Sequence, residues 1–241
     1  ISKMLRIILT ASLFGLVALF LTAALLMPAG NPVNTGAGVI CKVKTDEKIA
    51  ALTFNIGWGS RVPGPVLDVL KKENVQATFF IGGKWSKNHP ELARRIVNEG
   101  HEIGGGWEGL AGPGARADTV YRDLLVTTRS DIREATGISP ALFRITGGDW
   151  DAGLQAAARE PGCRVIQWSL DSLDIQTPGH YQIVNTILKG IQPGSIILLN
   201  ASDTASQTPQ ALPAVIEELR GEGYKLVTVS SLLELGPALA D

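Results

Sequence analysis

Short apolar segments and amphipathic segments alternate about seven times along most of the chain, and this alternation limits the fold more than any other feature. The apolar segments have the length of buried strands. They are residues 49–54, 77–81, 101–103, 141–144, 164–168, 195–199 and 225–229. The segments between them have helical period, most clearly residues 66–73, 90–99, 118–135, 181–190 and 209–222. This order predicts an α/β fold with a parallel sheet and outer helices, either closed into a barrel or open.

A long stretch near the start of the sequence carries no charge. No charged residue occurs between Arg6 and Lys42, and residues 7–27 form an apolar run of 21 residues. A helix of that length spans about 30 Å, the thickness of a bilayer core. We expect one transmembrane anchor at 7–27. Lys3 and Arg6 place residues 1–6 in the cytoplasm and the rest of the chain outside it.

A cleaved signal peptide is the alternative for this stretch. Its apolar part is usually about 7–15 residues long and is followed by a small-x-small site. The run here is longer, and no such site follows it. Residues 28–47 begin with a segment rich in Gly, Pro and Asn, and we expect a flexible linker there. Residues 48–241 then form the folded domain.

Composition excludes one class of partner and leaves the cysteines undecided. The chain has a net charge of -1, and its Lys and Arg residues are spread along the sequence. A nucleic-acid partner would require a basic surplus or stripe, so we exclude it. Cys41 and Cys163 are too few for a disulfide framework. One disulfide and two separate structural cysteines both remain open.

The segments at the ends of the predicted strands carry recognisable motifs. In order they read TFNIGWGS (53–60), ATFFIGG (77–83), GHEIG (100–104), FRITGGD (143–149), WSLDSLD (168–174) and IILLN (196–200). Together they resemble the motifs of the polysaccharide deacetylase family, the NodB-type domain of carbohydrate esterase family four. The resemblance runs from about Lys48 to about Leu235. Trp58 and Gly59 are similar to the branch associated with spore formation.

This resemblance implies a fold and a chemistry. The family fold is a distorted (β/α) barrel, which here would contain about seven parallel strands after one transmembrane helix. The family hydrolyses N-acetyl groups of amino sugars. A divalent metal such as zinc, held by one Asp and two His, polarises the acetyl carbonyl and activates water. A second Asp acts as the base, and a later His acts as the acid.

The sequence departs from the family at the positions that carry this chemistry. The metal-ligand positions are Ile56, Gly106 and Leu110, the base position is Asn55, and the acid position is Asn200. None of these side chains supplies a carboxylate or an imidazole. We therefore expect no metal cofactor and no hydrolysis.

Two supporting residues match the family. Arg144 matches the arginine that orients the base, and Asp171 matches the aspartate that pairs with the acid His. Both have lost those partners, so we interpret them as vestigial catalytic residues. A plain ion pair of Arg144 with Asp171 or Asp149 is the alternative.

Other residues near strand ends suggest a binding surface. Aromatic faces stack on sugar rings, so Trp58 and Trp107, with Asp149 and Asp174, are predicted to line a glycan groove. The alternative is that one or two of the tryptophans near strand ends belong to the core, first of all Trp168, which continues an apolar strand, and that the acids are solvated. A hard cation held by carboxylates alone, including Glu108, is conceivable, but their spacing does not require it.

Three hypotheses follow from the sequence. The first is a catalytically degenerate deacetylase-fold protein that binds or organises glycan of the cell envelope. The second is a working deacetylase of peptidoglycan or a chitin-like polysaccharide with a non-standard site. The third is a membrane-tethered interaction domain without affinity for glycan. We favour the first, because loss of a single catalytic group commonly costs several orders of magnitude in rate.

Overall fold

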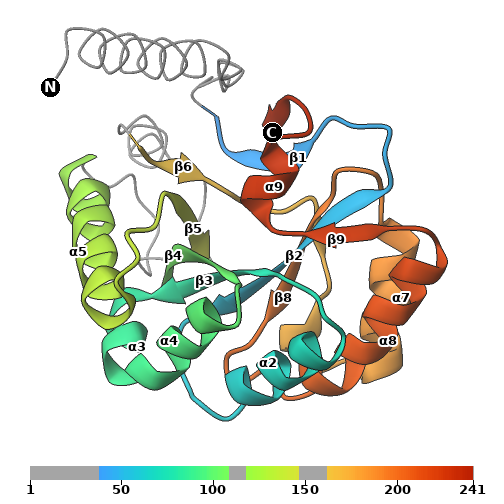
Figure 1. Cartoon of the computed structure of the whole chain (residues 1–241), viewed down its shortest axis with the longest axis horizontal. Coiled ribbons are helices and arrows are strands. Elements are labelled where there is room, and N and C mark those ends of the chain that lie inside the picture. Colours follow the sequence, from blue (N-terminus) through green and yellow to red (C-terminus); the bar gives the residue numbers. More distant parts are fainter. Residues whose placement is uncertain (1–37, 109–117, 147–161, 241) are drawn as a thin grey trace, which may run out of the picture. The chain divides into compact units, whose positions relative to one another are not determined.

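The computed structural model describes residues 38–108, 118–146 and 162–240, which form one curled parallel sheet with helices around it (Figure 1). The strand order is β6-β5-β4-β3-β2-β8-β7, and β9 pairs with β2 outside this path. The bounds are β2 (Ile49–Ile56), β3 (Thr78–Gly82), β4 (Glu102–Glu108), β5 (Leu142–Thr146), β6 (Arg164–Val165), β7 (Leu170–Asp171), β8 (Ile196–Asn200) and β9 (Lys225–Val227). Every pairing in this sheet is parallel, so the predicted α/β class is confirmed.

Helices cover the sheet, most of them on its outer side, and the last one, Val229–Leu233, packs against the inner cluster that contains Ala51 and Phe80 (Figure 1). They are α2 (Pro63–Lys72), α3 (Gly83–Asn88), α4 (Pro90–Asn98), α5 (Asp118–Thr136), α7 (His180–Gly190), α8 (Thr208–Gly221) and the short α9 (Val229–Leu233), with a 3-10 turn, η1, at Asp174–Gln176. Proline stands at the first turn of α2, α4 and α8, where its missing N–H leaves no helical bond unmade. The five predicted helices are therefore confirmed to within a few residues.

The shorter elements are the ones that the sequence pattern misses. Helices α3 and α9 have only six and five residues, and β7 has two. Segments this short complete no hydrophobic period, so their pattern cannot be distinguished from that of a loop. A two-stranded antiparallel ribbon of β1 (Ile40–Val43) and β10 (Ala238–Ala240) was also not predicted.

Strand β1 forms bridges to two segments of the curled sheet. Its Ile40 forms a parallel bridge with Ile166, just beyond β6, and its Lys42 forms an antiparallel bridge with Ser195, just before β8. The sheet is thus a half-barrel whose path has β6 and β7 at its edges, with β1 connecting two of its segments.

The two faces of the sheet pack into different clusters. On β2, Leu52, Phe54 and Ile56 belong to the large cluster between the sheet and the helices. Ala51 belongs to a second cluster, which includes Phe80 and lies on the inner side of the curl. Successive strand side chains point to opposite faces, so the odd-numbered residues of β2 face inward. This alternation decides which side chains reach the centre of the half-barrel.

The predicted N-terminal segments fall outside the described residues. These segments are 1–6, the anchor 7–27 and the first part of the linker up to residue 37. Within the described part of the chain, no helix has the length and apolarity needed to cross a membrane. Cys41 and Cys163 are both buried and belong to one cluster that also contains Phe143.

Candidate functional site

The candidate site lies where β2, β8, β4 and β5 approach their carboxyl ends. Asn55 of β2 is the register partner of Asn200 of β8. On the other side of the site, Gly106 of β4 is the register partner of Arg144 of β5. The four positions that the motifs assign to base, acid, metal ligand and supporting arginine are thus brought together by the sheet, as the sequence alone predicts.

Arg144 is a completely buried cation held by four hydrogen bonds. Its Nη1 donates to Thr53 Oγ1 at 2.7 Å and to Asn55 Oδ1 at 3.2 Å. Its Nε and Nη2 donate to the carbonyl oxygens of Ile166 and Gln167, at 3.2 and 3.0 Å. Among the described residues no carboxylate forms an ion pair with it. Burial lowers the pKa of Arg144 to about 9, so the guanidinium stays charged at neutral pH.

Aromatic rings complete the environment of this arginine. The Arg144 Cζ lies 4.0 Å from the centre of the Phe80 ring and 5.5 Å from that of Trp168. Gly104 makes room for the Phe80 ring, because a Cβ at Gly104 would lie 2.5 Å from Phe80 Cδ1. Trp168 is partly buried against the inner cluster, as the core alternative for the tryptophans supposes. Cation–π attraction of this kind is strongest in a desolvated site.

Asn200 is held by a buried carboxylate, and that carboxylate is Asp174. Asn200 donates from Nδ2 to Asp174 Oδ1 and from its backbone N–H to Oδ2, both at 2.7 Å. Thr208 Oγ1 donates to Oδ2 as well, at 2.6 Å. Burial raises the pKa of Asp174 above its usual value, while hydrogen bonds from Thr208, Asn200 and Ser172 act in the opposite direction.

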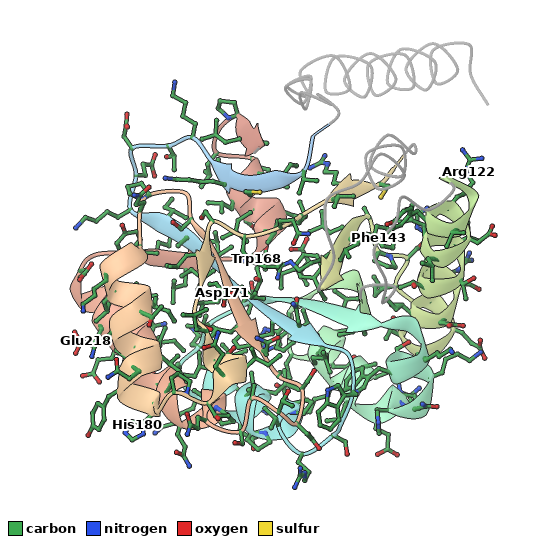
Figure 2. The ribbon with its side chains drawn as sticks, turned by 180° about the vertical axis from the view of Figure 1, so that it is seen from behind. Arg122, Phe143, Trp168, Asp171, His180 and Glu218 are labelled. Carbon is green, nitrogen blue, oxygen red and sulfur yellow. The ribbon has the colours of Figure 1, made fainter. Side chains whose placement is uncertain are left out.

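This arrangement corrects the role that the sequence suggested for Asp171. Asp171 Oδ1 accepts a hydrogen bond from the backbone N–H of Leu173 at 2.8 Å, and within the part of the chain that the structure describes it makes no hydrogen bond with Asn200 or Arg144. Two aspartates three residues apart look alike in the sequence. The turn between β7 and η1, with Leu173 at φ 59°, brings the second carboxylate under β8. Figure 2 shows Asp171 and Trp168 near the centre of the molecule, with His180 at its periphery.

The metal-ligand positions fit no metal ion. Ile56 is buried among apolar residues on the helix side of the sheet, facing away from Asn55. Gly106 has no side chain, and a Cβ there would lie 2.9 Å from Phe80 O and 3.0 Å from its carbonyl carbon. Leu110 lies outside the described residues. Within the described residues, no group of three His, Cys, Asp or Glu is placed to hold a metal ion.

Trp58, two residues after the end of β2, is exposed, with 48% of its surface accessible. Its loop is fixed on both sides. Gly57 N–H donates to Ser202 Oγ at 3.0 Å, and Trp85 Nε1 donates to Gly59 O at 2.6 Å. Gly59 has φ +81°, and a side chain there would collide with Asp203. Trp58 is therefore an aromatic residue at the surface on a well-supported loop.

Asp203 fastens the same loop to the segment after β8. Its carboxylate accepts from the Arg61 backbone N–H at 2.8 Å, from Arg61 Nε at 3.0 Å and from Val62 N–H at 3.2 Å. Burial alone would raise the pKa of Asp203, but donors from Arg61, Val62 and Ser60 outweigh it and hold the pKa below its usual value. No pattern in the sequence predicts this contact between distant segments.

The other predicted glycan contacts have different outcomes. Asp174 is fully buried, so it supports Asn200 and is not a surface contact. Trp107 lies in β4, but its side chain and that of Glu108 lie outside the described residues, as does the whole of Asp149. The hydrogen-bonding roles of Thr53 and Thr208 were not predicted, because threonine in an apolar strand or at a helix start has many structural uses.

The comparisons with known proteins agree with the motifs and the sheet. Residues 42–166 match the family profile described as polysaccharide deacetylase. The chain belongs to this family. It is 34% identical over 199 residues to a peptidoglycan-N-acetylglucosamine deacetylase of Bacillus cereus, a match that covers 81% of this chain and 92% of that enzyme. The resemblance inferred from the motifs, a NodB-type polysaccharide deacetylase domain, is confirmed.

Two further relatives extend the comparison. YlxY of Bacillus subtilis, an uncharacterized protein, is 30% identical over 197 residues; the match covers 81% of this chain but only 60% of YlxY. A CE4 family pseudoenzyme from Bacillus anthracis has a TM-score of 0.76 and 27% identity, covering 82% of this chain and 69% of that one. A mutant of that pseudoenzyme has restored enzymatic activity.

Proposed function

We propose that this polysaccharide deacetylase domain binds amino-sugar glycan of the cell envelope without hydrolysing it. The proposal depends on the side chains at two positions that the motifs assign to metal ligands. Ile56 faces the apolar cluster on the helix side, and Gly106 leaves no room for a side chain beside Phe80 O. A ligand atom cannot be supplied from either position, so no metal is proposed as a cofactor of this site.

The two positions that the motifs assign to the base and the acid support the same conclusion. Asn55 and Asn200 stand in for the base and the acid, and a carboxamide neither accepts nor releases a proton near neutral pH. Both amides are nevertheless hydrogen-bonded, their residues keep 6% and 8% of their surface exposed, and Trp58, three positions after Asn55, is exposed. Supported polar side chains and an exposed aromatic residue nearby in the chain are suited to sugar binding.

Glycan of the envelope is proposed as the partner because of the relatives. The Bacillus cereus protein and PgdA of Listeria monocytogenes, which is 33% identical over 192 residues, are named peptidoglycan-N-acetylglucosamine deacetylases. A chitooligosaccharide deacetylase of Rhizobium leguminosarum is 29% identical over 197 residues. The names of these relatives describe deacetylases that act on glycans containing N-acetylglucosamine. The exposed Trp58 supports the proposal that this domain binds such sugars.

Calorimetric titration with zinc and cobalt at neutral pH tests the loss of the metal. We expect no stoichiometric binding tighter than about 10 μM, which corresponds to roughly -7 kcal/mol. The Bacillus cereus relative serves as the positive control. Stoichiometric binding together with acetate release from chitooligosaccharides would instead establish a working deacetylase. Co-sedimentation with purified peptidoglycan tests whether the domain binds glycan. Absence of binding would leave only the hypothesis of an interaction domain without affinity for glycan.

The anchor and the location outside the cytoplasm are part of this proposal. They rest on the uncharged run at 7–27 and on Lys3 and Arg6 before it. The chain should remain with the membrane after an alkaline carbonate wash, whereas the chain without residues 1–30 should be released. Protease added outside intact cells should digest the domain. The motif with Trp58 and Gly59 supports the further proposal of a role in spore formation, which expression during sporulation would test.

A further inference from the structure

The loop that follows β2 is hydrogen-bonded on both sides of Trp58. Before Trp58, the Gly57 N–H donates to Ser202 Oγ at 3.0 Å, and after it, Gly59 O accepts from Trp85 Nε1 at 2.6 Å. Within the part of the chain that the structure describes, the indole of Trp58 makes no hydrogen bond of its own and is 48% exposed. The backbone of the loop is therefore fixed, whereas the aromatic ring that it carries stays accessible.

Asp203 makes the largest number of contacts with this loop. Its Oδ1 accepts from the N–H groups of Arg61 and Val62, at 2.8 and 3.2 Å, and its Oδ2 accepts from Arg61 Nε at 3.0 Å. The carboxylate also packs against Gly59, where any Cβ would collide with it. Only 8% of the side chain of Asp203 is exposed, and donors of the loop occupy both of its oxygens. Asp203 can therefore influence a ligand only through the loop.

The segment that contains Asp203 also ties the loop to the strand-end site. The Ala201 N–H donates to the carbonyl oxygen of Asn55 at 2.9 Å, so the chain after β8 stays bonded to β2 up to the start of the loop. Ser202 and Asp203 are the next two residues, and both bond to the loop itself. Three successive residues after β8 thus set the position of Trp58 relative to the end of β2.

We propose that Asp203 is a positioning residue for glycan binding, which holds the loop after β2 in the conformation in which Trp58 stacks on a sugar ring. This inference rests on the proposed binding of glycan, in which Trp58 is the exposed aromatic contact. A loop that is ordered before the ligand arrives loses less conformational entropy when the ligand binds. Asp203 therefore raises the affinity for glycan without touching the sugar.

A double-mutant cycle of Asp203→Ala and Trp58→Ala in the 241-residue chain tests this role. Calorimetry in mild detergent at pH 7 measures the affinity for the tetramer of N-acetylglucosamine. We expect Trp58→Ala to weaken binding about tenfold and Asp203→Ala about threefold to tenfold. The double variant should bind no more weakly than Trp58→Ala alone. Asp68→Ala removes the same charge from an exposed aspartate that bonds to Arg95, and it should leave the affinity unchanged.

Circular dichroism checks that Asp203→Ala folds, because this variant leaves two N–H groups before α2 without their acceptor. If it does not fold, Asp203→Asn replaces it, since an amide oxygen can still accept from these N–H groups while its NH2 group meets Arg61 Nε; its expected loss is about twofold to threefold. An unchanged affinity in the folded variant, or losses that multiply in the double variant, would overturn the positioning role while glycan binding stands. No binding of the tetramer by the parent chain would overturn both proposals.

Discussion

The two halves of the strand-end site differ in the residues that stand where the motifs predict the family's catalytic groups. At β2 and β8, Asn55 and Asn200 keep hydrogen bonds to Arg144 and Asp174, and the site remains polar. At Ile56 and Gly106, an apolar side chain faces the helix-side cluster and a glycine lies against the backbone of β3. The buried Arg144 and Asp174 need hydrogen-bonding partners, and the side chains at Asn55 and Asn200 have stayed polar. Among the described residues no such partner faces Ile56 or Gly106, and at these two positions there is an apolar side chain and no side chain at all.

The largest effect is expected from removing the cation that supports the polar half. Arg144→Met should lower the free energy of unfolding by about 3 kcal/mol or more, because Thr53, Asn55 and two carbonyl oxygens lose their buried donor. Urea denaturation measures the change. Arg61→Met, at an exposed arginine that bonds to the carboxylate of Asp203, is the control and should cost much less. If both variants lose the same free energy of unfolding, the buried hydrogen bonds of Arg144 contribute no more to stability than the exposed ones of Arg61.

The closed half is tested by adding one carbon atom. Gly106→Ala should cost about 1–3 kcal/mol, since the new Cβ meets Phe80 O and its carbonyl carbon, which belong to a strand backbone and cannot rotate away. Gly221→Ala is the control, because nothing lies within 4 Å of a Cβ there. If both variants have the same stability in urea, the steric closure at Gly106 is wrong and a histidine could be restored there.

A smaller effect should come from returning a charge to the polar half. Asn55→Asp places a carboxylate against Arg144 and replaces a neutral acceptor by a charged one, for an expected gain of about 1 kcal/mol at pH 7. Arg144 holds the pKa of such a carboxyl below its unfolded value, so the gain is present at neutral pH and disappears in acid. Denaturation at pH 7 and at acid pH measures it. A loss of stability at pH 7 would show that desolvation of the carboxylate outweighs the ion pair.

The smallest effect concerns His101, at the far end of β4 from the site. Its Nδ1 accepts a hydrogen bond from the Ala77 N–H at 3.2 Å. Burial lowers the pKa of His101 below 6.5; the charge of Glu99 opposes this shift, and the charge of Arg95 adds to it. The unfolded chain therefore binds the proton first, and stability should fall as the pH drops below about 6.5. His101→Asn keeps an acceptor but does not titrate, so its stability should lack this part of the slope. If the free energy of unfolding of the parent and of His101→Asn depends on pH in the same way, His101 is not the group responsible for this loss of stability.

The tertiary structure also corrects how the polar half is built. The sequence correctly placed Arg144, Asn55 and Asn200 in one site, because each lies in the last residues of a strand of the same parallel sheet. It assigned the supporting aspartate to Asp171, whereas Asp174 is the residue that holds Asn200. The three-residue turn that decides between them leaves no periodic signal, since its path depends on contacts with β8 and α8.

The sequence by itself determined the alternation of strands and helices, the family and the absence of proton-transfer groups at Asn55 and Asn200. These follow from local pattern and residue chemistry, which do not depend on the rest of the fold. Only the tertiary structure decided that Ile56 faces the helices, that Gly106 has no room for a side chain, and that Arg144 and Asp174 hold the two amides. Orientation and available space are set by neighbours distant in sequence, and no local pattern records them.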